Sequence, residues 1–169
     1  MTECVTAFLD GREIAAGERD ALTRALVGRH DEAQLSAVRA FDDRTGRPID
    51  LDYRGVVPPA ARGAGRPRLG VQAREVTLLP RHWDWLARQP GGASAALRRL
   101  VDEARSRPAG ARERQDAAYH FMQSLCGDMP GYEEALRALY RSNREDFDAI
   151  VAGWPADVVR YVAKLLGPA

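Results

Sequence analysis

The residue types that most often carry out catalysis or bind metals are scattered along this chain of 169 residues. The two cysteines, Cys4 and Cys126, lie in separate segments without a CxxC or CxxxC spacing, so we expect two free thiols in a reducing compartment. The histidines have no partner at metal-ligand spacing; they are His30, His82 and His120. The sequence also lacks the GxxxxGKS, GxSxG and HExxH motifs. We therefore predict a protein that is not an enzyme and that uses no metal or other cofactor.

Several acidic residues in the first third of the chain could bind a metal ion: Asp42, Asp43, Asp50 and Asp52. The first two begin the turn sequence DDRTG, and the other two alternate with apolar residues. Charged turns and outward-facing strand positions explain this pattern more simply than a metal ion does. We interpret these acids as turn and surface residues.

Arginine is the residue type whose distribution suggests a function, namely binding to a polyanion. Residues 53–107 carry 11 basic and 4 acidic side chains, a net charge of +7. Residues 1–52 carry 7 and 11, a net of −4, and residues 108–169 carry 7 and 9, a net of −2, which gives +1 for the whole chain. A basic middle between acidic flanks is typical of a nucleic-acid contact, with a solvated arginine-rich linker as the alternative.

The N-terminal residues predict a small α+β domain over 1–56. The sequence CVTAFLDGREIAAG predicts two strands joined by Asp10-Gly11, a dipeptide suited to a tight type I′ turn. A helix should follow over 17–28, with Leu22, Ala25 and Leu26 on its apolar face. A second hairpin is expected over 35–55, and its return strand has the alternating apolar residues Ile49, Leu51 and Tyr53. Two hairpins and one helix predict a sheet with one covered face.

The remaining flanking segments are a linker and a helical domain. Residues 57–72 are rich in proline and glycine, which is typical of an extended linker. Residues 108–169 predict a compact helical bundle, because short loops separate four amphipathic segments. The expected helices cover residues 112–127, 131–141, 144–154 and 155–167.

The central segment, 73–107, predicts a strand and two helices. REVTLLP is a run of β-forming residues that ends at Pro80, and proline suits the first turn of a helix. In the first helix, Trp83 and Leu86 are three residues apart and can share one face. Ser94 can cap the second helix. The apolar stripe of that helix consists of Leu97, Leu100, Val101 and Ala104.

With its strand, helix, Gly-x-Ser turn at Gly92–Ser94 and second helix, this segment resembles the ribbon-helix-helix DNA-binding module over residues 73–106. About 35 residues bury too little apolar area to fold alone. The resemblance implies a homodimer in which one strand from each chain forms an antiparallel ribbon that enters the major groove. It also implies that amides near Ser94 and Ala95 hold a phosphate. The implied dimer core is Val76, Leu78, Leu79, Trp83, Leu86, Leu97, Leu100 and Val101.

The strand has two possible orientations. The family pattern points Arg74, Val76 and Leu78 toward DNA. A shift by one residue exposes Glu75, Thr77 and Leu79 instead and buries Val76 and Leu78. The exposed side chains would then form a poor surface for contacts with DNA bases. The sequence leaves both orientations open.

A second short motif precedes the strand. Gly65-Arg66-Pro67-Arg68 is similar to the core of the AT-hook, which lies extended in the narrow minor groove of A·T-rich DNA. Its position suggests a basic arm in the minor groove beside a ribbon in the major groove. The candidate DNA-binding residues are Arg62, Arg66, Pro67, Arg68, Arg74, Thr77, Ser94 and Ala95.

The whole chain also resembles a family of uncharacterised bacterial proteins, through segments such as FDDRTGRPIDLD and REVTLLPRHWDWLARQPGGASAALRRLVDEAR.

We expect an α+β protein that acts as a homodimeric transcriptional regulator on double-stranded DNA in the bacterial cytoplasm, associated with the nucleoid. The C-terminal helices could bind a protein partner. The alternative is an adaptor or antitoxin-like dimer in which the ribbon-helix-helix core serves assembly alone. We expect no membrane span and no secretory signal.

Overall fold

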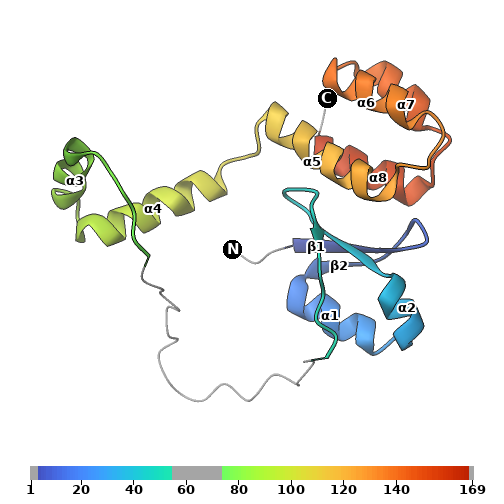
Figure 1. Ribbon diagram of the computed structural model, residues 1–169, viewed down its shortest axis with the longest axis horizontal. Coiled ribbons are helices and arrows are strands. Elements are labelled where there is room, and N and C mark those ends of the chain that lie inside the picture. The colour runs from blue at the N-terminus through green and yellow to red at the C-terminus, as the bar shows by residue number, and fades with distance from the viewer. Residues whose placement is uncertain (1–3, 55–73, 168–169) are drawn as a thin grey trace. The chain divides into compact units, whose positions relative to one another are not determined.

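A computed structural model describes residues 4–54 and 74–167, which belong to two compact units (Figure 1). Unit 1 combines Met1–Pro58 with Ala109–Ala169, and unit 2 is Pro59–Pro108. Unit 2 is therefore an insertion within the sequence of unit 1. This division differs from the one expected, in which 1–56 and 108–169 formed separate domains. The two flanking segments instead share one hydrophobic core.

The sheet of unit 1 has four antiparallel strands in the order β2-β1-β3-β4. β1 (Cys4–Leu9) and β2 (Arg12–Glu18) form the predicted hairpin. Asp10 and Gly11 have φ values of 50° and 75°, as a type I′ turn requires. β3 (Arg39–Asp42) pairs with β1, and β4 (Pro48–Ile49) pairs with β3. The return strand of the second hairpin is thus shorter than expected.

The first face of the sheet is covered by helix α1 (Arg19–Val27), as the sequence predicts. Leu22 and Leu26 are buried against the sheet, whereas Ala25 is exposed. A short helix that was not predicted, α2 (Glu32–Ala37), begins with a capping box between Asp31 and Gln34. The buried residues of this face are Val5, Ala7, Leu22, Leu26 and Ala40.

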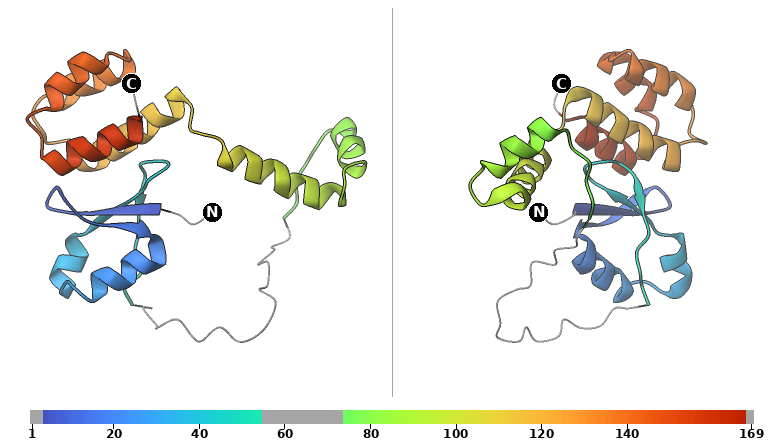
Figure 2. Two further views of the ribbon diagram at one scale, coloured as in Figure 1. Left: turned by 180° about the vertical axis from the view of Figure 1, so that it is seen from behind. Right: turned by 60° about the vertical axis from the view of Figure 1, so that its left-hand side comes forward.

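The second face of the sheet is covered by the C-terminal helices, so the prediction of one covered face is wrong (Figure 2). Four helices lie close to the positions expected from the sequence: α5 (Ala111–Leu125), α6 (Tyr132–Tyr140), α7 (Arg144–Val151) and α8 (Ala156–Leu166).

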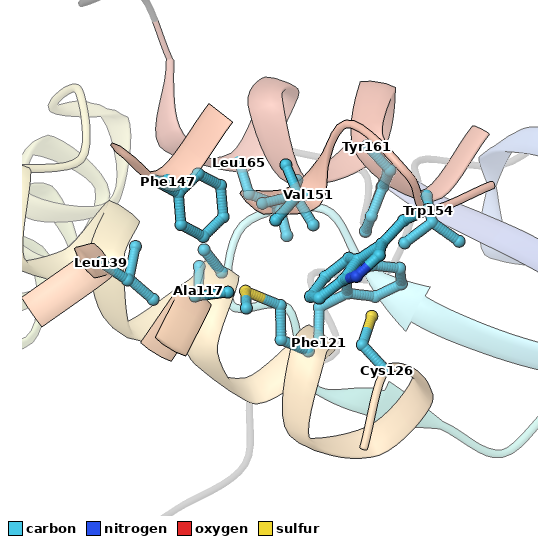
Figure 3. Packing of buried hydrophobic residues seen from close by; sticks show 14 of the residues in the cluster. Ala117, Phe121, Cys126, Leu139, Phe147, Val151, Trp154, Tyr161 and Leu165 are labelled. Carbon is cyan, nitrogen blue, oxygen red and sulfur yellow. The ribbon is translucent and has the colours of Figure 1, made fainter. Parts of the chain in front are cut away.

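Alternation along the strands explains how both faces of the sheet are buried. Phe8 and Phe41 point away from α1 and contact Phe121 of α5, with ring centroids 5.4 Å and 4.8 Å away. Tyr161 of α8 joins the same cluster at 4.7 Å from Phe121. Figure 3 shows how this core continues through Val151 and neighbouring side chains of α7 and α8. The aromatic cluster therefore joins the two ends of the sequence.

The turn between β3 and β4 packs directly on α5. Gly46 has a φ of 64°, and a Cβ atom placed on it would lie 1.9 Å from the carbonyl oxygen of Ala117. Glycine is required here for both its backbone conformation and its small size. This contact fixes the second hairpin against the C-terminal helices.

Unit 2 contains the two helices that the sequence predicts. α3 spans Pro80–Ala87 and α4 spans Gly92–Ser106, and the two helices pack against each other. Residues 74–79 precede α3 without forming a strand within the single chain.

Candidate nucleic-acid interface

The segment before α3 is extended and leads into a proline-initiated helix. Leu79 is the N-cap residue, with φ and ψ of −68° and 150°, and Pro80 follows in the first turn. The residue before a proline favours this extended conformation, which explains why the helix begins at Pro80. Within the described chain, residues 74–79 form no strand. A β-ribbon would need a second strand from a partner chain.

Two glycines form the turn between α3 and α4. Gly91 and Gly92 have φ values of 81° and 74°, which other residues rarely adopt. The prediction that Ser94 caps α4 is wrong, because the glycine turn starts the helix earlier. Gly91 is the N-cap, and no side chain caps it. Ser94 and Ala95 therefore lie in the first turn of α4, where several backbone N–H groups lack intrahelical acceptors.

The interior of unit 2 is very small. Leu86 of α3 and Ala96 of α4 are the buried residues among those described in this unit. Leu78 and Leu97 are half-buried. By contrast, unit 2 holds six of the eight large hydrophobic residues that are exposed in the described chain. They are Val76, Leu79, Trp83, Trp85, Leu100 and Val101, with exposed fractions between 40% and 54%.

Most of the predicted dimer core is thus present as an exposed apolar surface. Trp83 was expected to share the inner face of α3 with Leu86, yet it is 41% exposed while Leu86 is 3% exposed. Val101 of the α4 stripe is 54% exposed. Exposing several large apolar side chains on a unit this small is unfavourable in water. The geometry therefore leaves this surface available for a partner.

The described part of unit 2 carries more positive than negative charge. Residues 74–107 contain seven arginines and four acids. Four of the arginines are exposed and make no ion pair among the described residues; they are Arg74, Arg81, Arg88 and Arg99. Thr77 is also exposed. The candidates Arg62, Arg66, Pro67 and Arg68 lie outside the described residues.

The acids of the second hairpin have structural roles. The Asp42 carboxylate accepts hydrogen bonds from the backbone N–H groups of Arg44 and Thr45 and from the Thr45 hydroxyl, at 2.7–3.0 Å. Asp52 accepts one from the Arg54 amide. These contacts agree with the interpretation of Asp42 and Asp52 as turn residues. For Asp43 the interpretation as a surface residue is wrong, because its side chain is 15% exposed and contacts Thr6 and Tyr161. No group of three or more His, Cys, Asp or Glu side chains is placed to hold a metal ion in the described parts of the chain.

A partly buried polar network was not predicted from the sequence. The Asp43 carboxylate accepts hydrogen bonds from the Thr6 hydroxyl at 2.7 Å and the Tyr161 hydroxyl at 3.0 Å. It also forms a 2.8 Å ion pair with Lys164. Burial, followed by the nearby Asp43 carboxylate, raises the pKa of Tyr161. One signal was available, because Lys164 is the single lysine in the chain.

The fold and the candidate interface together define an α+β protein that carries a two-helix insertion with exposed apolar and basic side chains. Residues 4–166 match the family described as "Uncharacterized protein conserved in bacteria (DUF2239)", and the chain belongs to this family. The match spans both units and confirms the bacterial family expected from the sequence. No curated protein matches the chain. No solved structure matches it either. None of the described helices has the length and apolar character needed to cross a membrane.

Proposed function

We propose that this protein is a homodimeric DNA-binding protein that regulates transcription in the bacterial cytoplasm, associated with the nucleoid. In this proposal unit 2 of one chain pairs with unit 2 of a second chain. Residues 74–79 of both chains form a β-ribbon in the major groove, and the basic arm at Arg62, Arg66 and Arg68 enters the minor groove. The amides near Ser94 and Ala95 hold a phosphate.

The exposed apolar surface of unit 2 is the observation that carries the proposal. Two helices with two buried side chains cannot offset the conformational entropy of ordering this unit. Pairing with a second copy would remove Leu100, Val101 and Trp83 from water at once, as the ribbon-helix-helix resemblance implies. The exposed arginines then supply the charge that a DNA backbone attracts.

A matched pair of variants tests DNA binding. Arg66→Ala/Arg68→Ala/Arg74→Ala should abolish binding to a fluorescent duplex at low salt while the dimer stays intact by light scattering. Arg29→Ala/Arg137→Ala/Arg141→Ala removes the same charge from unit 1 and should leave binding within about twofold. Wild-type affinity should fall by about 0.9 log unit per released counterion for each log unit of salt. Equal losses in both variants would contradict the proposal.

An adaptor or antitoxin-like dimer is the second candidate, and the composition of the ribbon segment favours it. Residues 74–79 contain a single arginine, Arg74, next to the acidic Glu75, which is a weak surface for reading bases. Both candidates predict that Val101→Asp converts the dimer to a monomer, whereas Val27→Asp on unit 1 does not. A wild-type dimer that fails to bind duplex DNA at low salt would select the adaptor.

A further inference from the structure

A cavity in unit 1 has the size and lining of a small-molecule site. Its volume is about 550 Å³, and it lies beside the first half of α5, the junction between α6 and α7, and the end of α8. Cavities of this size hold metabolite-sized ligands in many proteins. Every residue that lines it belongs to unit 1, so the cavity is independent of unit 2.

One part of the lining is apolar. Leu139 and Phe147 reach it from the main hydrophobic core, where they are 5% and 2% exposed. Figure 3 shows these two side chains on neighbouring helices, next to the core around Ala117. Tyr140 adds an aromatic ring that is 53% exposed. These side chains form an apolar surface that suits the apolar part of a ligand. This surface continues into the hydrophobic core of unit 1.

The other part of the lining is cationic. Arg112, Arg114 and Arg144 line the cavity, together with one acid, Asp116. Arg144 is paired with Asp148 at 2.8 Å. Arg112 is exposed and makes no ion pair within the described residues. The charge around the cavity therefore favours an anion.

The guanidinium of Arg114 is only partly satisfied by hydrogen bonds. Its Nη1 group donates a hydrogen bond to the carbonyl oxygen of Ala109 at 3.1 Å. Its Nε atom is buried and has no hydrogen-bond partner in the described structure. A buried donor without an acceptor is unfavourable, and a bound water or ion is one arrangement that satisfies such a group in native proteins. An anionic oxygen is the kind of acceptor that this N–H group lacks.

The backbone between α6 and α7 is strained at the edge of the cavity. Ser142 has a φ of 55°, which is uncommon for a residue other than glycine. It is held there because its N–H donates to Leu139 O at 3.0 Å and the Asn143 N–H donates to Ala138 O at 3.1 Å. This conformation places both Ser142 and Asn143 in the cavity lining.

We propose that this cavity binds a small organic carboxylate with an apolar body. The carboxylate would lie against Arg112 and Arg114, because a guanidinium fork matches two carboxylate oxygens. The apolar body would contact Leu139, Tyr140 and Phe147. An inorganic anion would leave these apolar walls unused. The inference goes beyond DNA binding, because it requires no residue of unit 2 and its test contains no DNA.

Two carboxylate probes of different shape test the proposal on the full-length chain: 2-naphthoate, which is flat, and octanoate, which is flexible. Binding is followed by NMR, including the Nε–Hε signals of the arginines. At least one probe should bind saturably and shift the Arg114 signal. Its uncharged amide, 2-naphthamide or octanamide, should bind at least tenfold more weakly. The absence of saturable binding for both carboxylates, or equal affinity for acid and amide, would overturn the proposal.

Charge variants locate the probe. Arg112→Gln should weaken carboxylate binding at least fivefold without changing the unfolding temperature, because this exposed side chain makes no ion pair that holds the fold. Arg114→Gln should weaken it further. Arg137→Gln removes a charge from α6 outside the cavity and should leave the affinity within twofold. If Arg112→Gln and Arg137→Gln bind the probe as tightly as the wild type does, the site is not this cavity.

Discussion

Units 1 and 2 differ in whether their large apolar side chains are buried or exposed. Unit 1 buries both faces of its sheet, and its core extends from Phe8 to Leu165 across the sequence. Unit 2 buries Leu86 and Ala96 among its described residues and exposes six large hydrophobic side chains. The comparison indicates that unit 1 has the interior of an independently stable domain. Unit 2 has too few buried side chains for an interior of this kind, and most of its large apolar side chains lie on its surface.

The largest expected loss of stability comes from a substitution in the interior of unit 1, and a matched substitution in unit 2 gives the comparison. Phe121→Ala should lower the free energy of unfolding by about 4 kcal/mol, because it removes a fully buried ring that contacts Phe8, Phe41 and Tyr161. Leu100→Ala in unit 2 should cost less than about 1 kcal/mol in dilute solution, since Leu100 is 40% exposed. Urea unfolding followed by circular dichroism measures both. Similar losses at a concentration where light scattering shows a monomer would mean that unit 2 has an interior of its own.

A turn substitution should be almost as damaging to unit 1. Gly46→Ala should cost about 3 kcal/mol or more, because the new Cβ collides with the Ala117 carbonyl oxygen in a positive-φ turn. Gly153→Ala is the matched control, since a Cβ there meets nothing within 4 Å. Thermal unfolding of the two variants gives the comparison. A tolerated Gly46→Ala would mean that the second hairpin does not depend on its contact with α5.

The polar network should contribute an intermediate amount to unit 1. Asp43→Ala should destabilise the protein by about 2 kcal/mol, because it leaves the buried hydroxyls of Thr6 and Tyr161 without their acceptor. Lys164→Ala should cost less than about 1 kcal/mol, since the Lys164 side chain is 50% exposed. Chemical denaturation at neutral pH distinguishes the two. A larger loss for Lys164→Ala would mean that the ion pair, rather than the hydroxyl contacts, stabilises this junction.

The buried thiol of unit 1 should have the smallest effect at neutral pH and affect stability only in alkaline solution. Burial raises the pKa of Cys126 to about 12, whereas an unfolded cysteine ionises near pH 8.5. Above that pH the unfolded chain releases the thiol proton and the native chain keeps it. The free energy of unfolding should therefore fall by up to about 1.4 kcal/mol per pH unit between roughly pH 9 and 12 from this group.

Cys126→Ala is the control for this pH dependence, and its stability should decline less steeply over the same range. A thiol reagent supplies a second measurement at neutral pH. One cysteine, the exposed Cys4, should react quickly in the native protein, and Cys126 should react only after denaturation. Equal slopes for wild type and variant, or two fast thiols, would contradict the burial of Cys126.

Local signals in the sequence were sufficient for most elements. Asp10-Gly11 predicted its hairpin turn because few other dipeptides accept two positive φ values, and Pro80 predicted the start of α3. The helix α2 was missed because its six residues carry too short an apolar pattern. Ser94 was misassigned as a cap because a glycine turn, which sequence patterns describe poorly, starts α4 earlier.

Contacts between distant segments could not be predicted in the same way. The arginines at 112 and 114 meet Ser142 and Arg144 around one cavity, although no motif connects them in the sequence. Asp43 and Tyr161 are separated by 118 positions and join through a hydrogen bond. Such sites depend on how the helices pack on the sheet. No local pattern in the sequence indicates this packing.

The sequence by itself determined the helices of the C-terminal half, the first hairpin and the concentration of arginine in the middle of the chain. These features depend on residues that are close along the chain, through turn geometry, helix periodicity and charge. The tertiary structure decided that residues 1–58 and 109–169 form one unit with a sheet buried on both faces. It did so because Phe8 and Phe41 lie on the face opposite α1, and the C-terminal helices supply the apolar surface that covers them.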